Sequence, residues 1–234
     1  MMIKEITASL KYKVTRVYYQ HLLNGVNTLE EFNRYIKEIK PANFLRYKES
    51  SANQRLEFTT VIEKLSLNLN SINFLDIGPG FGDSMDICYE RGASQIEFVE
   101  RDPFFFTYNR LKKWCTGHQI NHLLGLHSLD QSKFDLIWIK GSLNADTFNK
   151  WPIRKISPAQ LNIWLDQLLR LGRPGCTIIL CPHWLSRDGK RKIENVEKSI
   201  FTKTILSKGF NILPTILHHN HEPEYPVTFF RKLS

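Results

Sequence analysis

Hydrophobic and polar residues follow two different patterns along the chain. In residues 1–70, apolar side chains recur with helical spacing and place one set on a single helical face: Phe32, Tyr35, Ile36 and Ile39. Thr28 and Glu31 stand three positions apart as in a capping box, which predicts that this helix begins at residue 29. A second helical pattern runs over about 51–69. This part of the chain therefore predicts helices only.

From residue 72 onward, short apolar runs typical of strands alternate with helical patterns. The predicted strands are 72–77, 96–100, 120–126, 134–139 and 176–181, and the predicted helices are about 83–91, 103–116 and 158–171. A basic helix over about 190–208 and two β-rich runs, 210–217 and 227–231, follow them. No crossover helix fits between those last two runs, so we expect them to pair antiparallel.

Near-continuous apolar strands that alternate with helices indicate a parallel sheet covered on both faces. The predicted fold is therefore α/β, a Rossmann-like, mostly parallel seven-stranded sheet that ends in an antiparallel hairpin. We expect this domain to span residues 71–234 and a helical N-terminal cap to span residues 1–70.

Composition removes several classes of protein. With 42% hydrophobic and 24% charged residues among 234, the chain has ordinary globular usage, which excludes collagen, coiled coil and wholesale disorder. Its four scattered cysteines form no C-x-x-C pair, which argues against a disulfide framework and a zinc ribbon. No apolar run is long enough to span a bilayer and the N-terminus lacks a secretory apolar segment, so we expect a cytoplasmic protein.

Two polar features leave their interpretation open. The net charge of +9 favours acidic partners such as nucleic acid or anionic glycans, but it is spread along the chain and also suits a merely basic soluble protein. The histidines His218, His219 and His221 lie close to acidic residues, but adjacent side chains point apart in a strand. We expect no metal site there.

The strongest local signal is a glycine-rich turn after the first predicted strand. Gly78, Gly80 and Gly82 follow the apolar run directly and precede a helix. Glycines allow the chain to turn sharply and to approach a ligand closely, and the N-terminus of the next helix favours an anionic group. The second strand ends at Glu100, 18 residues after Gly82, where a carboxylate can accept hydrogen bonds from a ribose diol.

These segments resemble a known family. The residues that carry the resemblance are the glycine turn LDIGPGFG (75–82), the acidic segment VERDP (99–103), the strand FDLI (134–137) and the segment LGRPGCTIIL (171–180). They are similar to the class I S-adenosylmethionine-dependent methyltransferases over about residues 72–232, and the terminal hairpin fits the sheet of that family.

The resemblance implies a role for each of these positions. Gly78, Gly80 and Gly82 would pack against the methionine part of S-adenosylmethionine, Asp76 would orient its amino group, Glu100 would hold the ribose hydroxyls, Arg101 would lie beside the adenine, and Lys140 would lie near the methionine end. The family often has an acid after the third strand that contacts the adenine amine. His127 and Ser128 occupy about that place here, so the adenine contact is left unassigned.

A catalytic base is needed only for an acceptor that arrives protonated, such as a hydroxyl. Our first candidate is His183, directly after the fifth strand, and the second is Asp146 in the long loop after strand four, with Asn144 beside it. Amino-group methylases of adenine and glutamine resemble one another in an Asn/Asp-Pro-Pro-aromatic turn after strand four, where this chain has 139–142, Ile-Lys-Gly-Ser. That departure argues against their chemistry.

We therefore predict an enzyme that transfers a methyl group to a small molecule or glycan, onto oxygen rather than nitrogen. The basic residues Arg46, Lys48 and Arg55 suggest that the acceptor is anionic. The alternatives are an RNA methyltransferase and an inactive methyltransferase-like protein that binds a nucleoside ligand or a partner. The glycine spacing and the terminal hairpin argue against a nicotinamide-dependent oxidoreductase, and the sequence leaves the oligomeric state open.

Overall fold

The computed structural model describes residues 18–40, 51–120, 125–144, 157–183, 200–214, 217–219, 222–224 and 227–234. Its strands are β1 (Asn73–Ile77), β2 (Gln95–Val99), β3 (Thr116–His118), β4 (Phe134–Asn144), β5 (Gly172–His183), β6 (Asn211–Pro214), β7 (Leu217–His219), β8 (Glu222–Glu224) and β9 (Val227–Lys232). Its helices are α2 (Leu29–Ile39), α4 (Ser51–Lys64), α5 (Asp83–Glu90), α6 (Pro103–Arg110), α8 (Pro158–Leu171) and α10 (Ile200–Ser207), with a 3-10 turn η1 (Leu126–Ser128).

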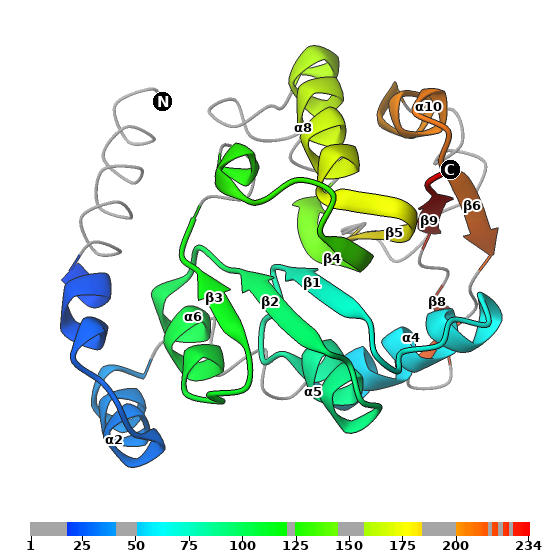
Figure 1. The fold of residues 1–234 in the computed structure, drawn as a ribbon. Helices are drawn as coiled ribbons and strands as arrows, with labels where there is room; N and C mark the ends of the chain where they lie inside the picture. The colour runs from blue at the N-terminus through cyan, green and yellow to red at the C-terminus, as the bar shows by residue number, and fades with distance from the viewer. Residues whose placement is uncertain are drawn as a thin grey trace.

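Seven strands form one sheet in the order β3-β2-β1-β4-β5-β9-β6 (Figure 1). Strands β1 to β5 pair parallel, whereas β9 runs antiparallel to both β5 and β6. The fold prediction is confirmed, including the antiparallel terminal pair. Short strands β7 and β8 pair with each other in a separate two-stranded sheet.

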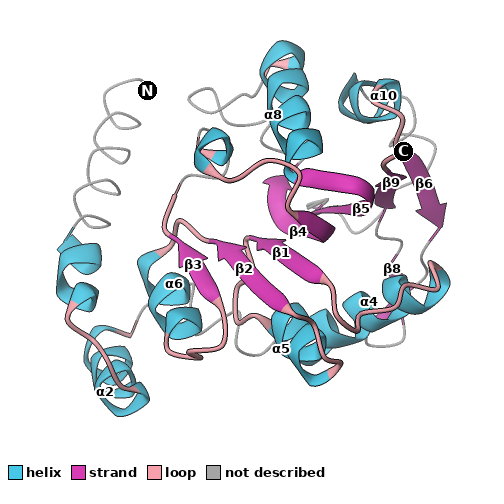
Figure 2. Ribbon diagram, in the orientation of Figure 1, coloured by secondary structure: helices cyan, strands magenta, loops and turns pink. Residues whose placement is uncertain are grey.

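Helices pack on both faces of the large sheet, as Figure 2 shows for the whole arrangement. On one face, the apolar side of α8 and Ile205 of α10 join the buried side chains of the strands in one core cluster. On the other face, α4 and α5 form a second cluster, in which the Phe58 ring lies 4.9 Å from Trp138 and 5.9 Å from Phe74. Helix α4, from the predicted cap, thus belongs to the layer that covers the sheet.

A third cluster joins the N-terminal helices to the rest. Helix α2 begins after Thr28 with the predicted capping box, and Phe32 is its buried residue. Phe32 shares this cluster with Leu23, with Phe104 of α6 and with Phe81 of the glycine-rich turn. The Tyr108 ring connects them, since it lies 5.9 Å from Phe32 and 5.3 Å from Phe81. The N-terminal helices therefore contact the segment that carries the strongest sequence signal.

The prediction for the third strand was wrong. We expected it over 120–126, but β3 spans Thr116–His118, and Leu126 lies in the turn η1 with its side chain in the core. Strand β3 has no apolar run because it lies at the border of the sheet, and Gly117 stands where Phe98 and Phe106 leave no room for a Cβ. Its pairing with β2 is a tertiary contact that local hydrophobicity does not record.

Two helix ends also differ from prediction. Helix α4 ends at Lys64 rather than near residue 69, and α6 ends at Arg110 rather than near residue 116. Beyond each helix, a residue adopts positive φ, Ser66 at 50° and Lys113 at 60°, and a left-handed residue interrupts a right-handed helix.

Candidate functional site

The glycine-rich turn connects the end of β1 to the start of α5. Gly78, Gly80 and Gly82 all adopt positive φ, at 76°, 57° and 75°. This left-handed backbone suits glycine, and at Gly82 a side chain would also collide, since an added Cβ would stand 2.4 Å from Oδ1 of Asn109. The Gly82 N–H donates to the Pro79 carbonyl at 2.8 Å, which closes the turn. The sequence pattern thus corresponds to a real and tightly packed turn.

Parallel pairing brings three strand ends together beside this turn. Ile77 of β1 is the register partner of Val99 of β2 and of Ile139 of β4. The next residues along the three strands are Gly78, Glu100 and Lys140, which therefore lie side by side toward the carboxyl edge of the sheet, where β4 itself continues to Asn144. This edge is where open α/β sheets bind ligands.

Asp76 lies fully buried just below the turn. The Ser84 hydroxyl, in the first turn of α5, donates to its Oδ2, while its Oδ1 has no hydrogen-bond partner within the described residues. Burial raises the pKa of Asp76 to about 7, the Ser84 bond opposes this rise, and the negative charge of Glu100 adds to it. A buried acceptor without a donor is costly, so this oxygen is a candidate to receive a ligand's N–H or O–H.

Glu100 is the second buried carboxyl at this edge. Its Oε1 accepts hydrogen bonds from the backbone N–H groups of Arg101 and Asp102, each at 2.8 Å. Burial raises the pKa of Glu100 to about 7, although these two bonds work in the opposite direction. Asp102 accepts from Phe104 N–H at 2.9 Å and so caps α6, which fixes the start of that helix directly after the acid. The carboxyl thus sits on a rigid support.

The end of α6 contacts the glycine turn from the other side. The Asn109 side-chain amide donates to the Gly80 carbonyl at 2.7 Å, and the Lys112 ammonium donates to the Phe81 carbonyl at 2.9 Å. Lys112 also pairs with Asp86 of α5 at 2.7 Å, and its side chain is only 13% exposed. These contacts tie the turn to α6 and α5 together.

Lys140 forms an ion pair with Glu57 of α4, and both side chains are nearly buried, at 13% and 8% exposure. Next to Lys140 in register is Cys181 of β5, whose thiol contacts the Thr228 hydroxyl at 3.5 Å. Burial, followed by the charge of Glu57, raises the pKa of Cys181 well above its ordinary value. Cys181 is therefore a neutral thiol at this site.

The other predicted site residues are placed only in part. Arg101 lies between β2 and α6, half-buried beside Glu100. His183 is the last residue of β5 and the register partner of Asn144, so its backbone lies at the carboxyl edge, while its side chain is outside the described part of the chain. Asp146 lies outside the described residues, and so do Arg46 and Lys48. Since β3 ends at His118, the loop that would carry an adenine contact starts there, before the predicted His127 and Ser128.

The sequence did not predict four residues at this site: Glu57, Ser84, Asn109 and Lys112. Each acts on a partner distant in the chain, from 8 positions away for Ser84 to 83 for Glu57. Only Ser84 carried a local signal, as a hydroxyl in the first turn of the helix that follows the glycines. The others needed the fold to be known.

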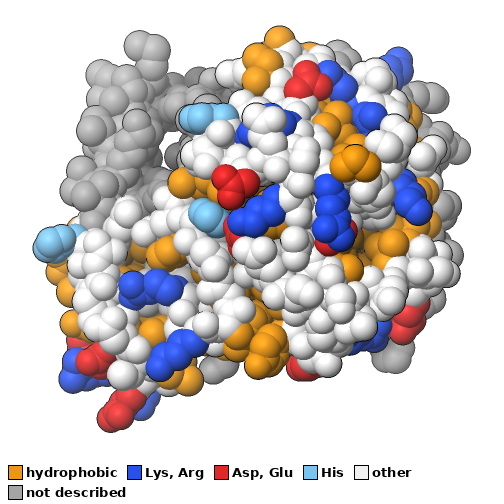
Figure 3. All heavy atoms as spheres, viewed as in Figure 1, with side chains coloured by type: hydrophobic (Ala, Val, Ile, Leu, Met, Phe, Trp, Pro, Cys, Tyr) orange, Lys and Arg blue, Asp and Glu red, His pale blue; other side chains and the backbone are white. Residues whose placement is uncertain are grey.

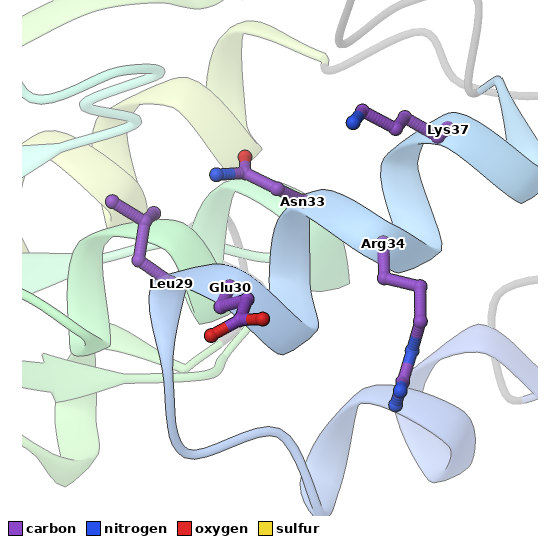
Figure 4. A pocket seen from close by; sticks show the side chains of 5 residues that line it. All are labelled: Leu29, Glu30, Asn33, Arg34 and Lys37. Atoms are coloured by element: carbon purple, nitrogen blue, oxygen red, sulfur yellow. The ribbon is translucent and has the colours of Figure 1, made fainter.

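A hollow on the protein surface lies apart from this edge of the sheet. An open hollow of about 510 Å³ is lined by Leu29, Glu30, Asn33, Arg34 and Lys37, all from α2, whose side chains fan out from one helix (Figure 4). It holds no residue of the carboxyl edge. Within the described ranges, no group of three metal-ligating side chains occurs, and no helix is long and apolar enough to cross a membrane.

Comparison with known proteins was made on sequence and on structure. No protein-family model matches the sequence, and no curated protein matches it. Solved structures do match. A SAM-dependent methyltransferase from Aquifex aeolicus aligns with a TM-score of 0.52 at 14% identity, over 82% of this chain and 98% of its own.

Two further solved structures are methyltransferases with a named substrate or reaction type. Magnesium protoporphyrin IX methyltransferase from Synechocystis PCC 6803, solved with bound SAH, gives a TM-score of 0.51 at 14% identity, over 78% of this chain and 84% of its own. The N-methyltransferase NodS from Bradyrhizobium japonicum gives 0.51 at 15% identity, over 77% and 96%. At such identities the match is one of fold, and the protein has the fold of the S-adenosylmethionine-dependent methyltransferases.

Proposed function

We propose that this protein is an S-adenosylmethionine-dependent methyltransferase that methylates a small molecule or glycan, on oxygen rather than nitrogen. The observation that carries the proposal is the pair of buried carboxyls, Asp76 and Glu100, beside a glycine turn in left-handed conformation. The fold supports it, because its solved neighbours include a methyltransferase with bound SAH.

The residues at the carboxyl edge fit this cofactor. S-adenosylmethionine carries an ammonium group and a sulfonium, and both favour a site rich in carboxylates. Asp76 offers the cofactor's ammonium an oxygen that has no partner among the described residues. Glu100, at the end of the second strand, offers a carboxyl that can accept hydrogen bonds from the ribose diol. The turn leaves space for the methionine part at Gly80, since an added Cβ there would meet, among the described residues, only Gln54, at 3.8 Å. Arg101 follows Glu100 and would lie beside the adenine.

When bound, the cofactor supplies an activated methyl group, so the protein's main contribution is alignment and exclusion of water. Asp76 would fix the amino group of the cofactor and Glu100 its ribose, with Lys140 near the methionine end. A hydroxyl acceptor would need a base, for which His183 at the end of β5 and Asp146 are our candidates. Substitution of the true base should lower turnover by about 10²–10⁴-fold and leave cofactor binding unchanged.

The acceptor proposal rests on the N-terminal helices. Helix α2 packs with Phe81 of the glycine turn and α4 pairs with Lys140, so both border the proposed cofactor. This placement of the two helices favours a small acceptor over an extended polymer. Arg55, one of the residues expected to attract an anion, is instead paired with Glu90 at 3.1 Å, so any anion preference would rest on other residues.

An RNA acceptor is the second candidate, and its support is the net charge of +9. On the face seen in Figure 3, the Lys and Arg side chains of the described residues are dispersed among carboxylates and apolar patches and form no continuous basic band. Binding to RNA would fall steeply with added salt, which separates this candidate from a small acceptor.

The first test is calorimetric titration with S-adenosylmethionine and S-adenosylhomocysteine, on the wild type and on Asp76→Asn and Glu100→Gln. We expect binding that each substitution weakens by tenfold or more, because each removes a charge-assisted bond worth about 1.5–3 kcal/mol. Asp130→Asn, an 80% exposed carboxyl, is the matched control and should bind as the wild type does. Failure of the folded wild type to bind either compound would overturn the proposal.

The acceptor is then sought with a donor labelled in its methyl group. Glycans, small hydroxylated molecules and RNA are offered separately at low and at physiological salt. Label in a small acceptor supports the proposal, and label in RNA alone favours the second candidate. Tight cofactor binding without transfer to any acceptor would favour a protein that only binds its ligand.

A further inference from the structure

The end of helix α6 makes contacts that neither the fold nor the predicted cofactor positions explain. Asn109 is fully buried and uses both amide hydrogens, one on the Gly80 carbonyl at 2.7 Å and one on the Phe105 carbonyl at 3.0 Å. Three residues later, the Lys112 ammonium lies 2.9 Å from the Phe81 carbonyl and 3.5 Å from the Gly82 carbonyl. Two side chains of one short segment thus hold three successive carbonyls of the glycine turn.

Placing the Lys112 ammonium beside backbone carbonyls in a nearly buried position costs desolvation free energy. A buried ammonium needs a partner charge, and Asp86 of α5 provides it at 2.7 Å. The rings of Tyr108 and Trp114 flank the ammonium at 5.5 Å and 5.6 Å from their centroids. The aromatic rings and the carboxylate together determine where the ammonium lies, and so determine where it can hold the turn.

The effect on the turn is conformational. Each peptide unit is planar, so a fixed carbonyl also fixes the direction of the N–H on the far side of the same unit. Asn109 and Lys112 therefore set the orientation of the peptide units that follow Gly80 and Phe81. Left-handed glycines have the largest freedom in the chain, so a turn built from three of them needs such restraints to keep one shape.

The same helix also carries the other half of the proposed site. Its N-terminus is capped by Asp102, next to Glu100, whose Oε1 is held by the N–H groups of residues 101 and 102. Only helical residues 103–108 therefore lie between the cap Asp102 and Asn109, the first residue that holds the glycine turn. A helix of this length is a stiff spacer between the two.

We propose that Asn109 and Lys112 are positioning residues for cofactor binding, which act through the glycine turn and keep it at a fixed distance from Glu100. This rests on the proposed function, because it assumes that the turn receives the methionine part of the cofactor and Glu100 the ribose. In this proposal the two residues do not touch the cofactor themselves. Helix α6 links the two regions that bind it, the glycine turn and Glu100.

The test compares two probes on variants of these residues. S-adenosylhomocysteine engages the turn and Glu100, whereas adenosine, which lacks the amino-acid part, engages only the Glu100 side. Lys112→Met removes the ammonium with little change in size, and Lys113→Met is the matched control, an exposed neighbour with the same loss of charge. Dissociation constants are measured by calorimetry, and melting temperatures are measured without ligand.

We expect Lys112→Met to weaken S-adenosylhomocysteine binding by about tenfold or more and to leave adenosine binding within about twofold of the wild type. Lys113→Met should match the wild type with both probes, and Lys112→Arg should recover most of the lost affinity. A purely structural role would weaken both probes equally. That result, or unchanged binding of S-adenosylhomocysteine by folded Lys112→Met, would overturn the proposal.

A second variant keeps the test decisive if Lys112→Met does not fold. Asn109→Ala removes the restraint on Gly80 and leaves the ion pair with Asp86 in place, and the same selective loss is expected. Equal loss of both probes in this variant would count against the proposal. A wild type that binds neither S-adenosylmethionine nor S-adenosylhomocysteine would instead overturn the proposed function, so the two failures are distinguishable.

Discussion

Glu57 and Lys140 form a nearly buried ion pair that joins helix α4 to strand β4. The two residues are 83 positions apart in the chain, and the pair connects the helical N-terminal part to the edge of the sheet where the proposed site lies. It is the charged counterpart of the apolar contact that Phe58 makes with Trp138 one residue further along α4.

Removal of one partner of this pair should be strongly destabilising. Glu57→Ala leaves the Lys140 ammonium buried without a counter-charge, and we expect a loss of about 3–5 kcal/mol in the free energy of unfolding. Arg55, which lies in α4 like Glu57, forms an exposed pair with Glu90 of α5, and breaking that pair with Glu90→Gln should cost at most about 1 kcal/mol. Urea denaturation measures both, and equal losses would contradict the buried pair's importance.

The stability of the ligand-free protein should fall as the pH rises toward neutrality. Asp76 and Glu100 have pKa values of about 7 when folded, above their ordinary values of 3.8 and 4.5, so between these limits the folded state holds more protons. The stability that this provides is complete below the ordinary values and is lost as the pH rises through 7. The slope for each group is at most about 1.4 kcal/mol per pH unit. Urea denaturation from pH 5.5 to 8 should show a smaller fall for Asp76→Asn than for the wild type.

Cofactor affinity should have the opposite pH dependence. A cationic ammonium and ribose hydroxyls bind the deprotonated carboxylates, so binding must release the protons that Asp76 and Glu100 hold below pH 7. We expect the dissociation constant for S-adenosylmethionine to increase on acidification from pH 8 to 6, by at most about tenfold per pH unit for each carboxyl. Glu100→Gln should bind more weakly and with a flatter pH profile. Calorimetry in matched buffers checks this, and a pH-independent affinity in the wild type would contradict it.

Glu97 of β2 should stabilise the border of the sheet. Its carboxylate, 4% exposed, contacts the Lys133 ammonium at 2.5 Å and the His118 ring at 2.8 Å, and although burial opposes them, these two bonds lower its pKa. Glu97→Gln should therefore cost about 1–3 kcal/mol at pH 7. Asp130→Asn removes an exposed partner of Lys133 and should change stability by less than about 0.5 kcal/mol. Because the pKa of Glu97 is lowered, its contribution is present above its ordinary pKa and is lost on acidification below it.

Two glycine substitutions separate backbone strain from lack of space. Gly175→Ala places a side chain at φ 87° with no described residue within 4 Å, so it should cost only the left-handed penalty of about 1–2 kcal/mol. Gly82→Ala adds a collision with Oδ1 of Asn109 to a similar penalty, and we expect it to cost about 1–3 kcal/mol more. Thermal unfolding compares the two. Equal losses would mean that Asn109 moves aside without cost.

The candidate site was predictable where a single segment carries it. A strand, a turn and a helix follow one another locally, and this pattern pointed to Gly78, Gly80, Gly82 and Glu100. Because glycine adopts positive φ easily, the three glycines themselves indicated a turn with left-handed backbone. Asp76 was found in the same segment, but its unpartnered oxygen depends on which donors the fold brings near it.

Residues that act across the fold were not predictable. Asn109 lies in the last turn of α6 and Lys112 two residues beyond its end, and the sequence gives no sign that this segment reaches a turn about 30 positions earlier. The sequence did not predict strand β3 for the same reason, because its three residues become a strand only by pairing with β2. Local periodicity records burial along one element and carries no information about which element lies opposite.

The sequence by itself thus determined the alternation of strands and helices, the antiparallel ending of the sheet and the glycine turn with its acid, since each follows from hydrophobic period or from the backbone freedom of particular residues. Only the tertiary structure decided that Gly78, Glu100 and Lys140 lie side by side, that Glu57 pairs with Lys140, and that Asn109 and Lys112 hold the turn. The physical reason is that strand register, ion pairs and the accessibility of buried oxygens depend on the packing of segments far apart in the chain, which is fixed when the whole core forms.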